Sequence, residues 1–154
     1  MKIRKDISEF NYSKINNIKF LVIHDTGNKN DSAAGNANYF GGGNRSASAH
    51  YFVDDKEIVQ VVEEGNAAWH CGDGHNKYGI HNHNSIGIEM CRKNNDVTEK
   101  TEENTIELIK SLMKKYNINI ENVVRHYDAS RKLCPQSFSK TGWKRWTDFK
   151  IKLK

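Results

Sequence analysis

The chain has 154 residues, 36% hydrophobic and 28% charged, with a formal net charge of +5. This balance is typical of one globular domain with its own core rather than of a disordered or membrane protein. No stretch approaches the roughly 20 apolar residues that cross a membrane, so we expect no membrane insertion. We therefore expect a single domain over residues 1–154, and a monomer, since nothing in the sequence calls for oligomerisation.

The first half of the chain predicts three strands and one short helix. An apolar run rich in strand formers carries His24 at its C-terminal end, and a polar loop follows it. Three consecutive glycines, Gly41 to Gly43, end a short helical segment. The predicted elements are a strand at 19–24, a helix at 32–40, and the two strands of a β-hairpin at 49–53 and 57–62.

The second half opens with a long loop rich in glycine, asparagine and histidine, of the kind that often lines a site. In the strand after it, apolar residues alternate with Gly87 and Glu89, so Glu89 faces away from the apolar side. The predicted elements are this strand at 85–91, a helix at 98–116, a strand at 122–125 and a helix at 143–151. The irregular alternation predicts an α/β fold, a central mixed β-sheet flanked by helices.

Three side chains suggest a metal site. His24 and His126 each end a predicted strand, and Cys134 follows His126 by eight residues, so the three could converge at one sheet edge. Two imidazoles and a thiolate suit tetrahedral Zn²⁺ and leave a fourth position open, as in catalytic sites. The alternative is that each histidine is a structural residue held by hydrogen bonds.

Five segments occur in an order that resembles the type 2 N-acetylmuramoyl-L-alanine amidases. They are FLVIHDT at 20–26, SAHYFV at 48–53, AWHCG at 68–72, NSIGIE at 84–89, and HYD at 126–128 followed by KLCP at 132–135. That family includes phage endolysins, autolysins and recycling amidases, and is similar in fold to the peptidoglycan recognition proteins. The resemblance covers residues 18 to 146, and several ordered motifs are more specific than any one alone.

The resemblance implies roles for five residues. It makes His24, His126 and Cys134 the zinc ligands, Glu89 the catalytic base and Lys132 its electrophilic partner. Without the motifs, Glu89 would be interpreted as a solvated carboxylate and Lys132 as an ordinary surface lysine.

Residues near the metal site receive weaker assignments. His70 matches a histidine on the substrate groove of related enzymes, and Trp69 could stack on sugar or pack under the loop. His50 is expected to support the site through hydrogen bonds. Some phage members have a tyrosine where this chain has Ala49, so we favour the glutamate as base.

The implied reaction is zinc-dependent hydrolysis of the amide between N-acetylmuramic acid and L-alanine in bacterial peptidoglycan. The basic charge would suit an anionic cell wall, and no nucleic-acid-binding signature is present, so we expect no nucleic-acid partner. The charged N-terminus lacks a signal-peptide pattern, which predicts cytoplasmic synthesis and favours a phage or prophage endolysin that acts on the wall after release. The alternatives are a cytoplasmic muropeptide-recycling amidase and a non-catalytic peptidoglycan-binding module.

Overall fold

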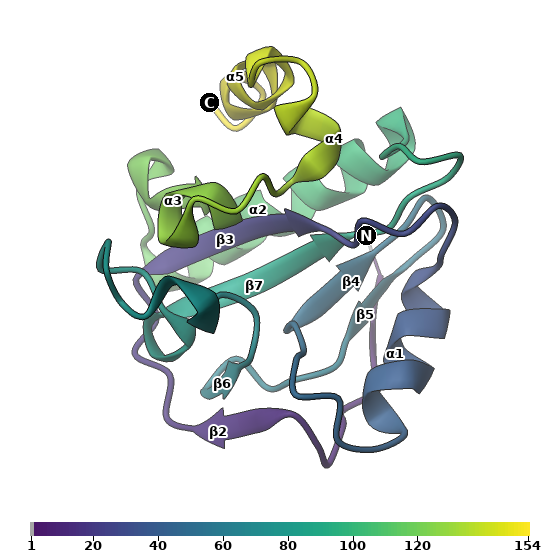
Figure 1. Cartoon of the computed structure of the whole chain (residues 1–154), viewed down its shortest axis with the longest axis vertical. Coiled ribbons are helices and arrows are strands. Elements are labelled where there is room, and N and C mark those ends of the chain that lie inside the picture. The colour runs from purple at the N-terminus through teal and green to yellow at the C-terminus, as the bar shows by residue number, and fades with distance from the viewer. Residues whose placement is uncertain (1) are drawn as a thin grey trace.

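The centre of the fold is a six-stranded sheet of mixed direction. A computed structural model describes residues 2–154, and Met1 lies outside the described residues. The strand order is β1-β5-β4-β7-β3-β8, and all neighbours are parallel except the β4–β5 hairpin (Figure 1). The strands are β1 Ile3–Lys5, β5 Ile58–Gln60, β4 Tyr51–Val53, β7 Ser85–Met90, β3 Phe20–Asp25 and β8 Val123–Arg125. A second sheet pairs β2 Tyr12–Lys14 with β6 Asn66–Ala68 in antiparallel fashion.

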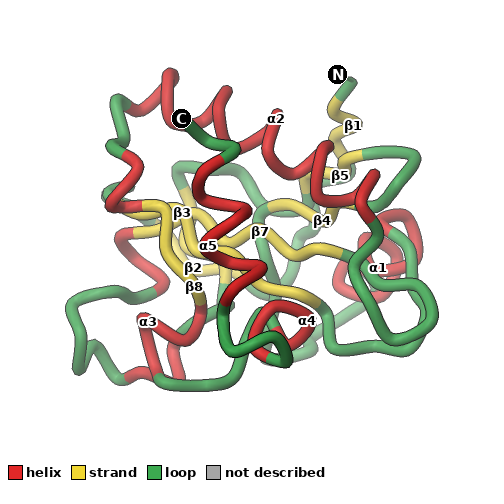
Figure 2. Tube along the Cα trace, turned by 90° about the horizontal axis from the view of Figure 1, so that it is seen from above, coloured by secondary structure: helices red, strands yellow, loops and turns green. Residues whose placement is uncertain are grey.

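Helices cover both faces of the central sheet. On one face, α2 (Glu99–Tyr116), α4 (Gln136–Ser139) and α5 (Lys144–Ile151) contribute to the largest cluster of buried side chains. On the other face, α1 (Ala33–Gly41) and α3 (His126–Ser130) pack over two smaller clusters. Figure 2 shows the strands between α2 on one side and α1 and α3 on the other. Among the described residues, no helix is long and apolar enough to span a bilayer.

The predicted fold class is confirmed, and the helix at 98–116 is the best example. Thr98 caps α2 by accepting a hydrogen bond from the backbone N–H of Thr101, and Asn117 ends the helix in the left-handed conformation. Acidic residues lie in its first turn and lysines in its last, which complements the helix dipole. Among the strands and α-helices, the prediction missed five short elements, namely β1, β2, β6, α3 and α4.

A buried polar cluster joins α2 to the sheet. The Glu64 carboxylate accepts hydrogen bonds from the hydroxyls of Tyr51 and Tyr116 and pairs with Lys115. Burial alone would raise the pKa of Glu64, but hydrogen bonds from Lys115, Tyr116 and Tyr51 outweigh it and hold the pKa below its ordinary value. The ionised carboxylate therefore stabilises the packing of α2.

The substitution Glu64→Gln is expected to destabilise the fold by about 1–3 kcal/mol at neutral pH, because it leaves buried donors without an ionised partner. The folded-state pKa is depressed, so the stabilisation is present above the unfolded-state pKa of about 4.3 and is lost as pH falls through the folded-state value. Urea unfolding at neutral and acidic pH measures this. The exposed neighbour Glu63 provides the matched variant Glu63→Gln, and an equal effect of both substitutions would contradict the expectation.

Candidate metal and catalytic site

Two neighbouring parallel strands deliver the first two residues of the site. His24 lies near the end of β3 and is in direct register with Glu89 on β7. Residues in register on adjacent strands point to the same face, so both side chains leave the sheet on the α1 and α3 side. His24 Nδ1 lies 3.9 Å from Glu89 Oε1.

The other two residues come from the chain after β8. His126 is the first residue of α3, and its Nδ1 lies 3.0 Å from His24 Nδ1. Cys134 follows in the loop between α3 and α4, and its Sγ lies 3.8 Å from His24 Nδ1. The Asp25 carboxylate anchors this loop by accepting a hydrogen bond of 2.7 Å from the backbone N–H of Ser137.

The geometry of His24, His126 and Cys134 fits a metal ion. One ligand atom from each residue lies within 4.8 Å of the other two, and all three side chains are buried. Two imidazole nitrogens and a sulfur are the donor set that Zn²⁺ prefers, with a fourth position left for a water or substrate. Glu89, whose Oε1 lies near His24, has its other oxygen Oε2 buried without a hydrogen-bond partner, so the site contains an unsatisfied polar group.

Burial controls the protonation of the cluster. It lowers the pKa of His24 well below its ordinary value, and the neighbouring rings of His126 and His70 lower it further. Burial also lowers the pKa of His126, although the carboxylate of Asp73 opposes this. Both imidazoles are therefore neutral at neutral pH, which is the form that binds metal.

Glu89 has the electrostatic environment of a general base. Burial raises the pKa of its carboxyl group to about 8, the Asp25 carboxylate adds to the rise, and the Lys132 ammonium opposes it. A carboxyl group with a pKa near the working pH both accepts and releases a proton readily. The interpretation of Glu89 as a freely solvated carboxylate does not hold, since its side chain is 19% exposed.

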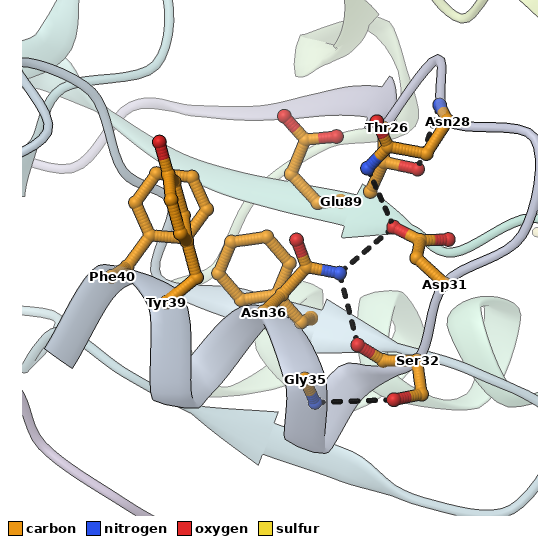
Figure 3. Close-up of a pocket in the computed structure, with 10 residues that line it drawn as sticks. Thr26, Asn28, Asp31, Ser32, Gly35, Asn36, Tyr39, Phe40 and Glu89 are labelled. Carbon is orange, nitrogen blue, oxygen red and sulfur yellow. Dashed lines mark hydrogen bonds between the residues drawn. The ribbon is translucent and has the colours of Figure 1, made fainter. Parts of the chain in front are cut away.

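Two cavities border the cluster. The first has a volume of about 580 Å³, and Glu89 lines it together with aromatic residues, among them Phe40 and Phe52, and polar residues of the 26–36 segment (Figure 3). The second, about 410 Å³, is lined by His126, Lys132 and the residues Ser46, Trp69, His70, Gly72, Asp73 and Asn82. His24 lies close to both Glu89 of the first cavity and His126 of the second, so it lies between residues that line the two cavities.

Inside the first cavity, Asp31 organises the polar wall. Its carboxylate accepts hydrogen bonds from the side-chain amides of Asn28 and Asn36, and from the backbone N–H of Arg92. Figure 3 shows these amides beside Asp31, with Glu89 on the strand behind them.

The three residues predicted to lie near the metal site do lie around it, and each makes different contacts. His70 Nδ1 is 3.0 Å from His24 Nε2, so this ring touches a candidate ligand as well as the second cavity. The Trp69 indole N–H donates to Ser13 Oγ, which fixes the ring on the cavity wall. His50 accepts a hydrogen bond from the backbone N–H of Gly87 and contacts the His70 ring. Direct contact of Trp69 and His70 with substrate stays a prediction.

The glycine of the Ser-Ile-Gly-Ile-Glu segment makes room for His70. A Cβ atom at Gly87 would lie 2.5 Å from His70 Cγ, closer than side chains tolerate. Gly74 has a similar role in the 71–84 loop, because a Cβ there would lie 2.1 Å from the backbone oxygen of Ala129 in α3. These two glycines let the loop and its histidine approach the candidate metal ligands.

The substitution Gly87→Ala is expected to destabilise the fold by about 1–3 kcal/mol, because the added methyl group displaces the buried His70 ring. Urea unfolding of the purified variant measures this loss. Gly65→Ala is the matched control, since nothing lies within 4 Å of a Cβ at that position. Equal stability of the two variants would show that His70 moves aside at no cost.

The sequence interpretation missed Asp73 and Ser85 as parts of the site. Asp73 lies in a short 3₁₀ helix (Gly72–Gly74), with its Oδ1 2.7 Å from His126 Nε2. Ser85 begins β7, and its hydroxyl lies 3.1 Å from His70 Nε2. The period-two pattern of β7 places Ser85 on the same face as Glu89 and could have found it. No periodicity marks Asp73, because a 3₁₀ helix of three residues is too short to show one.

The chain belongs to the N-acetylmuramoyl-L-alanine amidase family, whose model matches residues 14–137. This confirms the resemblance drawn from the ordered motifs. Among curated relatives, N-acetylmuramoyl-L-alanine amidase CwlL of Bacillus licheniformis is 35% identical over 133 residues, which cover 79% of this chain and 37% of CwlL. CwlH of Bacillus subtilis is 39% identical over 119 residues, covering 76% of this chain and 47% of CwlH. The chain thus spans less than half the length of these two relatives.

Solved structures show the same fold over the whole chain. The structure of PlyL is 35% identical, with a TM-score of 0.89, and covers 100% of this chain and 98% of its own. The catalytic domain of XlyA is 34% identical, with a TM-score of 0.86, and covers 100% of both chains. The single-domain mixed α/β architecture therefore matches that of an isolated catalytic domain.

Proposed function

We propose that this protein hydrolyses the amide bond between N-acetylmuramic acid and L-alanine in bacterial peptidoglycan, with Zn²⁺ as cofactor. The observation that carries the proposal is the convergence of His24, His126 and Cys134 beside the buried, unpartnered carboxylate of Glu89. Family membership and the names of the relatives support the substrate. The alternative of hydrogen-bonded structural histidines leaves the unpartnered oxygen of Glu89 unexplained.

Each residue has a distinct task in the proposed reaction. Zn²⁺ held by His24, His126 and Cys134 supplies Lewis acidity, which polarises a carbonyl group and lowers the pKa of water to about 7. Glu89 takes the proton of the attacking water and passes it to the leaving amine of L-alanine. Lys132 lies beside His126 on the second cavity, where its ammonium group stabilises the negative charge that develops on the carbonyl oxygen.

The two cavities suit a branched substrate. A muramyl peptide extends from the scissile amide in two directions, as a glycan and as a stem peptide, and one cavity is lined by Glu89 while the other is lined by His126 and Lys132. Trp69 offers an indole face to a ligand in the second cavity, and His70 offers only ring carbon because both of its nitrogens are engaged. We propose peptidoglycan as the partner of a monomer formed by one catalytic domain over residues 1–154.

The biological setting that we propose is that of a phage or prophage endolysin. Solved relatives include a mutant endolysin from Bacillus subtilis, 34% identical to this chain. The net charge of +5 favours association with an anionic wall. In this setting the protein is made in the cytoplasm and reaches the wall after release.

Mass spectrometry of purified peptidoglycan digested with the protein tests the reaction. We expect stem peptides with a free L-alanine amino terminus and glycans with intact lactyl groups. Sugar-reducing ends, or cleavage within the stem peptide, would overturn the assigned bond. Release from soluble muropeptides but not from intact sacculi would instead identify a recycling amidase, and binding without release would identify a non-catalytic module.

A further inference from the structure

We propose that two hydrogen-bond chains hold both ligand histidines with Nδ1 free of hydrogen, and that Ser85 and Asp73 are the positioning residues that end these chains. The inference rests on the proposed zinc site. It concerns the state of the protein before any metal binds. It assigns a task to two residues that the family motifs do not explain.

The first chain begins at a backbone carbonyl, which can only accept. Ser85 Oγ lies 2.6 Å from the carbonyl oxygen of His81, so the single hydroxyl hydrogen of Ser85 is used in that bond. The same Oγ lies 3.1 Å from His70 Nε2 and must accept there. His70 therefore carries its hydrogen on Nε2.

The direction of that bond determines the state of His24. A neutral imidazole has one N–H, so a hydrogen on Nε2 of His70 leaves its Nδ1 as an acceptor. His24 Nε2 lies 3.0 Å from this atom and must donate to it. The hydrogen of His24 is then on Nε2. Its Nδ1 carries no hydrogen, and this atom is the one near His126 and Cys134.

The second chain leads to the same state by a separate route. The Asp73 carboxylate, an acceptor, lies 2.7 Å from His126 Nε2, so His126 donates through Nε2 and its Nδ1 is bare. The two bare nitrogens lie 3.0 Å apart with their lone pairs toward one another. Two facing lone pairs repel each other unless a metal ion or a shared proton lies between them, so the hydrogen bonds on the far sides of the rings prepare the site for a metal ion.

The first hydrogen-bond chain gives a role to each inward-facing residue of the Ser-Ile-Gly-Ile-Glu segment. Ser85, Gly87 and Glu89 alternate along β7 and point to one face. Ser85 orients His70, Gly87 gives the His70 ring its space, and Glu89 lies beside His24. Gly74 contributes from the loop, because its close approach to α3 brings Asp73 within reach of His126.

Nitrogen NMR of the histidine rings in the metal-free full chain at neutral pH tests the tautomers directly. We expect His24, His70 and His126 each to carry hydrogen on Nε2 alone. In Ser85→Ala, His70 loses its acceptor, so His24 and His70 should become mixtures of both tautomers. Asp73→Ala should have the same effect on His126, whereas Asp73→Asn should restore the Nε2–H form because its amide oxygen still accepts.

Zinc affinity, measured by competition with a chromophoric chelator, gives the second readout. We expect Ser85→Ala and Asp73→Ala each to weaken zinc binding by about 10- to 100-fold, with partial recovery in Asp73→Asn. Cys91→Ala is the matched control, because Cys91 is also a free, buried cysteine but its side chain contacts Asn36 rather than a member of either chain, and the zinc affinity of this variant should equal that of wild type.

Two results would overturn the proposal: hydrogen on Nδ1 of His24 or of His126 in the wild-type protein, or wild-type zinc affinity in both alanine variants. Failure of the proposed function looks different. A wild-type protein that binds no zinc would remove the zinc-dependent reaction, while the ring tautomers would still support or overturn the two hydrogen-bond chains.

Discussion

Replacement of Glu89 by glutamine is expected to reduce amidase turnover by about two to four orders of magnitude while zinc remains bound. The amide keeps the size of the side chain but cannot accept the proton of the attacking water. Glu89 is not one of the three candidate ligands, so the metal content should stay near one equivalent. Release of amino termini from purified walls, together with metal analysis of the same sample, measures both quantities.

The control for this variant is Glu107→Gln, an exposed carboxylate on α2 with unchanged expected turnover. Unchanged turnover in Glu89→Gln would remove Glu89 from the mechanism. Simultaneous loss of zinc and turnover would instead make Glu89 part of the metal-holding group.

Regular periodicity explains why much of the site could be predicted from the sequence. The apolar run before His24 and the alternation around Glu89 each define a buried strand, and parallel pairing in register then brings the two residues together. His126 follows a third strand in the same sheet, β8, which pairs with β3. Residues at the ends of adjacent parallel strands meet at one sheet edge, so the convergence of His24, Glu89 and His126 could be expected from the strand pattern, whereas the role proposed for Cys134 depends on the family resemblance.

The parts that could not be predicted depend on contacts between distant segments. β1 has three exposed residues and forms only because β5 offers it a parallel edge. Asp73 reaches His126 because Gly74 allows a loop to approach α3, a contact across 53 positions that no local pattern encodes. The role of His70 likewise depends on its hydrogen bonds with Ser85 and His24.

These contacts also link the fold to the proposed chemistry. The loop that delivers Cys134 is tied to β3 twice: Ser137 donates its backbone N–H to Asp25, and Cys134 lies 3.8 Å from the backbone oxygen of the same residue. The sulfur of Cys134, a proposed ligand, is thus positioned by the strand that carries His24. A change in this loop should alter metal binding before it alters the stability of the core.

The substitution Cys134→Ala tests that link and should abolish stoichiometric zinc binding and nearly all amidase activity. It removes one of three protein ligands, and the loss should exceed the roughly 10- to 100-fold change typical of residues that only support a ligand. Burial raises the pKa of the Cys134 thiol well above its ordinary value, so a bound cation must favour the thiolate for the sulfur to act as a ligand.

Cys91→Ala is the matched control, since Cys91 is also free and buried but lies outside the metal-binding group. Metal analysis, chelator treatment and re-addition of zinc separate the two variants: activity should return with zinc in Cys91→Ala and not in Cys134→Ala. Full activity of the chelated wild-type protein would contradict a zinc-dependent reaction, whereas activity that returns only with zinc would make Cys134, together with the two histidines, the centre of the catalytic site.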